Sequence, residues 1–265
     1  MSSPPCLKVD AVRRRWRYWL VGALLLAGVA AGAPALYRLA PMLKGPEPGA
    51  QMVVLLHGLG RQPRAMLQLE GALRGAGYDV RNIGYPSTQA EPAELVEVLH
   101  RKLTQCCQAS EQAVHYVGHS LGGLMIRAYL GANRQLPVGR VVLIGTPNAG
   151  SELADAHRHG ELTGALLERA GPTAQALSTG PDGFPASLPP PHYEVGVIAG
   201  TRGNAMSDRW LPKPNDGLVS LSSAKLAGMS DMVTLSENHW GLRNAPEVGA
   251  QVVAFLRSGA FAPSP

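Results

Sequence analysis

The sequence predicts an α/β domain with a mostly parallel central sheet, helices on both faces and a small insertion, preceded by a transmembrane helix. From residue 51 onward, short apolar runs alternate with segments of helical spacing, as expected for strands that are covered on both faces. Residues 18–37 contain no charged side chain and follow a cluster of arginines. The chain has 265 residues, enough for one large domain and an N-terminal tail.

The N-terminal segment is expected to anchor the protein in a cell membrane. Residues 18–37 are long enough to cross the hydrocarbon core, with Trp and Tyr near the first end and Tyr37 at the other. More Lys and Arg precede the segment than closely follow it, so residues 1–17 are predicted to be cytoplasmic and the main domain extracytoplasmic, at the inner membrane of a bacterial-type cell. A cleaved signal peptide, which would release a secreted protein, is the alternative. A buried helix of the domain is disfavoured by the arginine cluster.

The net charge of +5 lies entirely in the N-terminal region. Residues 1–50 contain seven Lys or Arg and two acidic residues, whereas residues 51–265 contain seventeen of each sign. A domain without net positive charge is poorly suited to a phosphate backbone, so no nucleic-acid partner is expected.

Strands and helices alternate along the main domain. Strands are expected in QMVVLLHGLG (51–60), YDVRNIGYP (78–86), AVHYVG (113–118), GRVVLIGTP (139–147), HYEVGVIAG (192–200) and SDMVTLSE (230–237), and helices over 63–75, 91–108, 121–131 and 245–257. This alternation predicts a parallel sheet with crossover helices.

Two segments depart from this alternation. Residues 38–50 are rich in Pro and Gly and are predicted to be a linker, which leaves 51–265 as the main domain. About 150–191 the pattern changes to a helical stretch and a Pro-rich loop, which predicts a small cap inserted at one end of the sheet.

The three cysteines predict no disulfide framework. Cys6 lies in the predicted cytoplasmic segment, and the adjacent Cys106 and Cys107 are expected to be free thiols in a helix, because neighbouring cysteines bridge only with strain.

Ser120 is the candidate nucleophile. It stands in GHSLG between an apolar strand and an apolar helix, the context in which Gly-x-Ser-x-Gly forms a sharp turn that exposes the serine. Gly118 and Gly122 are expected to flank it because a side chain at either position would clash in such a turn. Without that context, the motif would describe only a glycine-rich turn.

A serine needs a base, and the base needs an acid that orients it. In hydrolases with such a turn, the acid and then the histidine follow the serine along the chain. His239 lies between the last strand and the last helix and is the predicted base, in preference to three other downstream histidines, His157, His159 and His192. Asp216 is the predicted acid, although NDG can also form a simple hairpin tip. Asp208 and Glu194 are the competing acids.

The loop after the first strand, HGLG, is expected to supply half of an oxyanion hole. Backbone N–H groups of Leu59 and of Leu121, the residue after the nucleophile, are the predicted donors. Gly58 allows close approach of the backbone, and His57 is expected to brace the loop.

Five motifs, VVLLHGLGR, GHSLGG, GTPNAGS, NDGLVSLSSA and NHW, stand in the order and spacing of the α/β-hydrolase lipases. Over about residues 51–257 the chain resembles the bacterial triacylglycerol-lipase and serine esterase branch of that superfamily. The resemblance implies the triad Ser120, Asp216 and His239, oxyanion donors Leu59 and Leu121, and a lipid or acyl ester as substrate.

The chain also departs from that branch. Secreted lipases of this kind usually carry a larger lid and often a calcium site with paired aspartates, whereas SENHW offers Glu237 and Asn238 but no aspartate beside His239. No metal or other cofactor is therefore expected.

The sequence thus predicts a membrane-anchored carboxylic ester hydrolase that works through an acyl-enzyme. An acyltransferase with the same triad is the alternative, and a non-catalytic binding or chaperone protein of the same fold is a third reading. Acyl chain length, leaving group and protein partners are not specified by the sequence.

Overall fold

The structure is a computed structural model that describes residues 46–107, 112–160 and 171–263. The predicted cytoplasmic segment 1–17, the predicted anchor 18–37 and most of the linker 38–50 lie outside these residues. Within the described ranges, no helix has the length and apolar character needed to cross a bilayer. The membrane anchor therefore stays a prediction.

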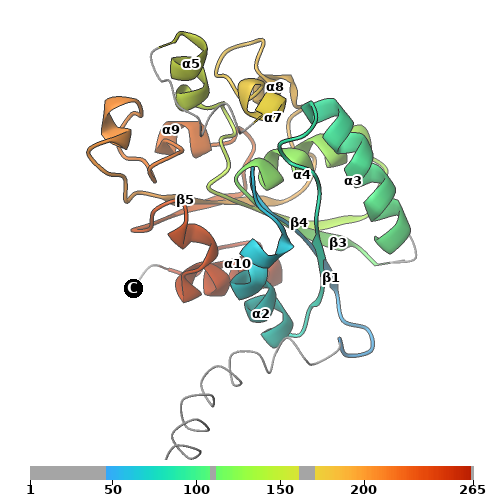
Figure 1. Cartoon of the computed structure of the whole chain (residues 1–265). Coiled ribbons are helices and arrows are strands. Elements are labelled where there is room, and N and C mark those ends of the chain that lie inside the picture. The colour runs from blue at the N-terminus through green and yellow to red at the C-terminus, as the bar shows by residue number, and fades with distance from the viewer. Residues whose placement is uncertain (1–45, 108–111, 161–170, 264–265) are drawn as a thin grey trace, which may run out of the picture. The chain divides into compact units, whose positions relative to one another are not determined.

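Six parallel strands form one sheet in the order β2-β1-β3-β4-β5-β6. Figure 1 labels its inner strands β1, β3, β4 and β5. The strands are β1 (Met52–Leu56), β2 (Asp79–Ile83), β3 (Val114–His119), β4 (Val138–Ile144), β5 (Val195–Gly200) and β6 (Asp231–Leu235). All six strands were expected from the sequence, and all six are confirmed. The sheet is wholly parallel because every connection between neighbouring strands passes through helices or long loops.

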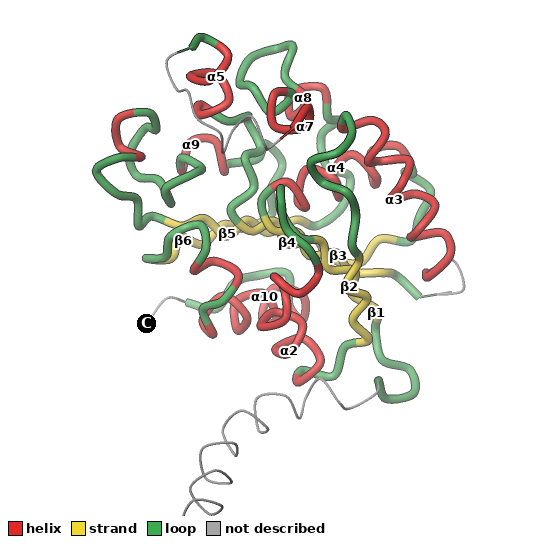
Figure 2. The backbone as a smooth tube through the Cα atoms, in the orientation of Figure 1, coloured by secondary structure: helices red, strands yellow, loops and turns green. Residues whose placement is uncertain are grey.

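The helices cover both faces of the sheet (Figure 2). The α-helices are α2 (Leu67–Gly75), α3 (Pro92–Cys107), α4 (Leu121–Ala132), α5 (Glu152–Arg158), α7 (Gly171–Gln175), α8 (Phe184–Ser187), α9 (Leu221–Ala224) and α10 (Pro246–Ser258). Short 3-10 turns occupy Pro63–Met66, Ser207–Arg209 and Gly241–Arg243. The four long predicted helices are confirmed.

Alternate residues of each strand enter different cores. In β1, Val54 and Leu56 pack with α3 and α4, whereas Val53 and Leu55 pack with α2 and α10. All four side chains are completely buried. This pattern explains why the strand reads as an unbroken apolar run rather than an alternating one.

The strand order reverses between β1 and β3, because β2 lies on one side of β1 and β3 on the other. In such sheets, a crevice forms outside the carboxyl ends of the strands at the point of reversal. The segment after β1 is the HGLG loop and the segment after β3 is Ser120. The topology therefore brings the two predicted halves of the site to one edge.

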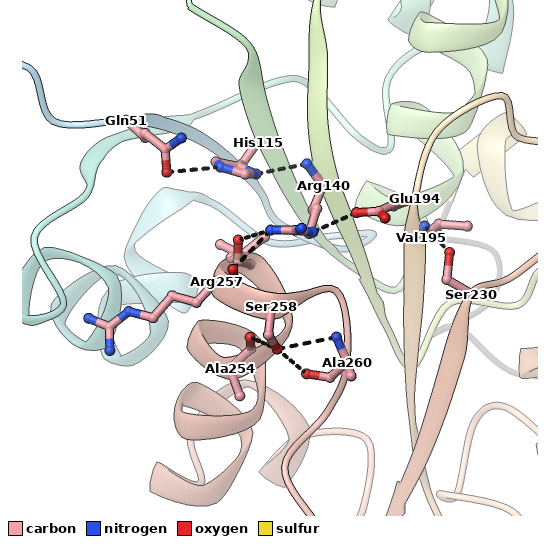
Figure 3. A network of polar contacts seen from close by, with 11 residues as sticks. Gln51, His115, Arg140, Glu194, Val195, Ser230, Ala254, Arg257, Ser258 and Ala260 are labelled. Atoms are coloured by element: carbon pink, nitrogen blue, oxygen red, sulfur yellow. Dashed lines mark hydrogen bonds and ion pairs between the residues drawn. The ribbon is translucent and has the colours of Figure 1, made fainter.

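The amino edge of the sheet is held by a polar network (Figure 3). The Arg140 side chain donates to Glu194 at 2.6 Å and to the carbonyl groups of Leu256 and Arg257 at 3.0 and 3.1 Å. The Arg140 backbone N–H donates to Nδ1 of the buried His115 at 2.7 Å. These bonds attach the C-terminal end of α10 to the start of β4.

The predicted insertion and the cysteine pair lie partly or wholly within the described residues. The described parts of the predicted insertion, 150–160 and 171–191, contain α5, α7 and α8. Thr173 there donates to the Ala90 carbonyl at 2.6 Å, which attaches α7 to the loop after β2. A cap function stays a prediction. The expectation of free thiols is wrong, because a disulfide joins Cys106 and Cys107, whose sulfur atoms meet in the last turn of α3.

Candidate active site

Ser120 occupies a strained turn between β3 and α4. Its φ is 56° and its ψ is −125°, and it is the one non-glycine residue with a positive φ in the part of the chain that the structure describes. Serine at the start of a helix normally caps it, but the Ser120 side chain makes no such bond. A strained backbone and a hydroxyl not used for capping are features expected of a nucleophile on an elbow.

The glycines around Ser120 permit this turn. A Cβ at Gly118 would lie 2.6 Å from the backbone of Gly123, and one at Gly122 would lie 2.5 Å from the Leu56 carbonyl oxygen. Gly58 faces the serine directly, since a Cβ there would lie 3.0 Å from the Cβ of Ser120. Strand, elbow and HGLG loop are thus packed backbone against backbone.

Asp216 and His239 form a buried pair. Their side chains are 1% and 4% exposed, and Asp216 Oδ2 lies 2.8 Å from His239 Nδ1. Asp216 Oδ1 accepts the N–H groups of Leu218 and Val219 at 2.9 and 2.8 Å. The backbone N–H of His239 donates to the backbone carbonyl of Asp216 at 2.8 Å. Backbone and side-chain bonds therefore both hold the two residues together.

The pair lies next to the ends of β3 and β4. The Ser120 N–H donates to the Ile144 carbonyl at 2.8 Å. At the following Gly145, a Cβ would lie 3.3 Å from both Asp216 Oδ2 and His239 Cε1. The structure therefore brings all three predicted residues to the carboxyl edge of the sheet.

His119, which sequence reasoning missed, joins the serine turn to the histidine loop. Its ring packs on the His239 ring with centroids 4.7 Å apart, and its Nε2 donates to the His239 carbonyl at 3.0 Å. Burial is the main cause that holds the pKa of His119 well below its usual value, and the neighbouring His239 lowers it further. The His119 ring is therefore neutral. His119 is the x of Gly-x-Ser, and no sequence signal distinguishes it there.

The two competing acids are engaged elsewhere. Asp208 pairs with Lys213 at 2.8 Å and accepts from Asn215 at 3.0 Å. Glu194 lies at the amino edge of the sheet in its ion pair with Arg140. Neither carboxylate makes a hydrogen bond to His239 within the described ranges.

The predicted oxyanion residues flank Ser120. Leu121 is the first residue of α4, whose initial N–H groups have no partner within the helix, and Leu59 follows Gly58 in the HGLG loop. His57 is fully buried, stacks on Tyr85 with ring centroids 4.5 Å apart, and has its carbonyl bonded by the Tyr85 hydroxyl at 2.6 Å. These contacts hold the loop in place. Tyr85 could not be predicted from the sequence, because it follows β2 whereas His57 follows β1, and the two meet only in the folded chain.

The remaining predicted features lie apart from this site. His157 and His159 are at the end of α5, and His192 is exposed. An open cavity of about 380 Å³ at the amino edge is lined by His115, Leu136, Arg140, His192, Tyr193 and Glu194. It lies at the opposite end of the strands from Ser120, and three of its lining residues, His115, Arg140 and Glu194, belong to the network of Figure 3.

The described residues contain no cluster of three or more His, Cys, Asp or Glu side chains that could hold a metal ion. Glu237, the acid closest in sequence to His239, is paired with Arg202 at 2.6 Å.

Comparison with known proteins identifies a family and a fold. A family model described as a domain of unknown function, DUF7379, matches residues 36–195, more than half of the chain. No curated protein matches the sequence.

Solved structures with the same fold include lipases and esterases at low sequence identity. Bacillus licheniformis lipase BlEst2 in its mature form has a TM-score of 0.64 at 20% identity, over 82% of this chain and 94% of that one. Esterase RhEst1 from Rhodococcus sp. ECU1013 has a TM-score of 0.55 at 19% identity, over 81% and 93%. Phospholipase PlaB from Legionella pneumophila has a TM-score of 0.56 at 12% identity, over 80% of this chain and 57% of that one. The chain therefore has an α/β-hydrolase fold.

Proposed function

We propose that this chain, which belongs to the DUF7379 family, is a serine hydrolase that cleaves carboxylic esters, with Ser120 as nucleophile, His239 as base and Asp216 as the acid that orients it. The observation that carries the proposal is the buried contact of 2.8 Å between Asp216 and His239, beside a serine held at positive φ. A lipid or acyl ester is the proposed substrate, in keeping with the lipases and esterases that share the fold.

In this mechanism, Asp216 accepts the Nδ1–H of His239, which leaves Nε2 free to take a proton. As Ser120 Oγ attacks the ester carbonyl, its proton passes to Nε2. The backbone N–H groups of Leu59 and Leu121 stabilise the oxyanion. His239 then protonates the departing alcohol, and the acyl group remains on Ser120.

Water completes the cycle in the same site. His239 takes a proton from the water as its oxygen attacks the acyl-enzyme, and the carboxylic acid leaves when Ser120 recovers its proton. The strained backbone of Ser120 keeps the hydroxyl in position through both steps, because the surrounding glycines hold the turn tightly packed.

Replacement of the nucleophile tests the proposal. Ser120→Ala is expected to abolish hydrolysis of p-nitrophenyl butyrate while the protein keeps its circular dichroism spectrum. Ser258→Ala is the matched control, because Ser258 lies on α10 at the amino edge of the sheet and should retain full activity (Figure 3). Undiminished activity of Ser120→Ala would exclude Ser120 as nucleophile.

A further inference from the structure

Two arginines stack on one tryptophan beside the proposed site. The guanidinium carbon of Arg61 lies 4.3 Å from the ring centroid of Trp240, and that of Arg243 lies 5.2 Å from it. Trp240 is 43% exposed, so part of this cluster faces solvent. Each cation gains from contact with the ring, but the two like charges repel each other.

The described residues supply no acid to balance the two charges. Neither Arg61 nor Arg243 belongs to any ion pair in the described ranges. Glu237 lies nearby in sequence, but its carboxylate pairs with Arg202.

Arg243 carries donors that are left without a partner. Its Nε and Nη1 atoms are buried and make no hydrogen bond to a described residue. Burial and the neighbouring charge of Arg61 both lower the pKa of Arg243. Nη2 of Arg243 is not among these buried atoms, so it is the nitrogen that can meet a ligand, and a guanidinium gains most from a carboxylate or phosphate oxygen.

The cluster is contiguous with the proposed catalytic residues. Trp240 directly follows His239, and the two rings meet edge to face with centroids 5.9 Å apart. Arg61 directly follows the HGLG loop, and its N–H donates to the Gly58 carbonyl at 3.2 Å. The cluster therefore borders both the loop of the predicted base and the HGLG loop, which packs against Ser120.

We infer that Arg61 and Arg243, held on Trp240, bind an anionic carboxylate or phosphate group of the ester substrate. This inference rests on the proposed function and refines its substrate class. Guanidinium groups suit oxyanions because they donate parallel N–H bonds, and the tryptophan limits the positions that the two side chains can take. The enzyme would then prefer acidic esters over neutral ones of the same size.

Two pairs of esters test this preference on the full chain. Hydrogen adipate and hexanoate esters of p-nitrophenol differ by one carboxylate in the acyl part. In the second pair, 4-butyryloxybenzoate and its methyl ester, the carboxylate is in the alcohol part. Because hydrogen bonds to charged groups are stronger than those between neutral groups, kcat/KM should favour the acidic member of at least one pair by about tenfold or more.

Charge-removing variants identify the residues responsible. Arg61→Gln and Arg243→Gln should each lower kcat/KM for the preferred acidic ester by about tenfold and change that for its neutral partner less than about twofold. Arg101→Gln removes the same charge from an exposed position on α3 and should leave the preference intact. Equal kcat/KM within both ester pairs, or a preference that survives in the double variant, would overturn the inference.

The source of the anion and the underlying function can be separated. Faster fatty-acid release from phosphatidylglycerol than from phosphatidylcholine vesicles, lost in the double variant, would assign the anion to a lipid headgroup. A preference confined to the soluble esters would assign it to a small substrate. Calorimetric binding of the preferred acidic ester and of its neutral partner to Ser120→Ala measures the preference without turnover. Undiminished hydrolysis by that variant would contradict the proposed nucleophile, whereas equal binding would contradict only the anion site.

Discussion

Replacement of Asp216 by Asn tests the acid of the proposed triad while its shape is kept. The Oδ1 atom of asparagine can still accept the two N–H groups that Asp216 Oδ1 now accepts from Leu218 and Val219. The amide NH₂ then faces His239 Nδ1. That nitrogen must become an acceptor, so the ring proton moves to Nε2 and His239 can no longer take the proton of Ser120.

The expected fall in kcat for Asp216→Asn follows from the distance between Asp216 and His239. When His239 becomes an imidazolium, its charge is stabilised by Asp216 across 2.8 Å. With an effective dielectric constant of about 20, this attraction is about 6 kcal/mol. A barrier change of 1.36 kcal/mol is tenfold in rate, so complete loss of the attraction corresponds to a factor of about 10⁴. Because the amide dipole retains part of the interaction, we expect kcat to fall by about 10³ to 10⁴.

Steady-state hydrolysis of p-nitrophenyl butyrate gives kcat and KM separately for each variant. Asp216→Asn should lower kcat with little change in KM, because the lost interaction forms only as the proton is transferred. Asp208→Asn is the matched control, since that carboxylate pairs with Lys213 and should be dispensable for the reaction. A kcat for Asp216→Asn within tenfold of the unaltered protein, with normal thermal unfolding, would refute the assigned role.

Two further predictions concern stability. Because Ser120 has a φ of 56°, Ser120→Gly should be more stable in urea unfolding than Ser120→Ala by about 1–2 kcal/mol, and equal stability would contradict backbone strain. Burial lowers the pKa of His119 in the folded protein. As the pH falls below about 6.5, His119 therefore takes up a proton in the unfolded chain but not in the folded one, and the free energy of unfolding decreases. His119→Gln should reduce the slope of unfolding free energy against pH by up to about 1.4 kcal/mol per pH unit. If the urea midpoints of the variant and the unaltered protein change equally between pH 7 and pH 5, the effect is excluded.

The fold could be predicted because its pattern is local. The run MVVLL is buried on both faces, so it differs from amphipathic segments such as 92–107 without knowledge of any partner. The candidate site could be proposed for a related reason. Ser120, Asp216 and His239 each follow a predicted strand, and parallel strands bring the loops at their carboxyl ends to one edge.

The supporting contacts could not be predicted because they join residues far apart in the chain. His119 packs on His239, and Tyr85 packs on His57, through tertiary approach that leaves no periodic signal. The same holds for Arg61 and Trp240, which are far apart in the sequence but in contact in the fold. The disulfide between Cys106 and Cys107 was missed for a different reason. Adjacent cysteines usually bridge only with strain, and the sequence alone does not identify an exception.

The position of a covalent label tests most directly whether Ser120 is the nucleophile. A fluorophosphonate reacts with an activated serine hydroxyl, so the full chain should carry one adduct, on the peptide that contains Ser120, as mapped by tandem mass spectrometry. Ser120→Ala should remain unlabelled under the same conditions. An adduct at another residue, or none in a preparation that hydrolyses esters, would contradict the account.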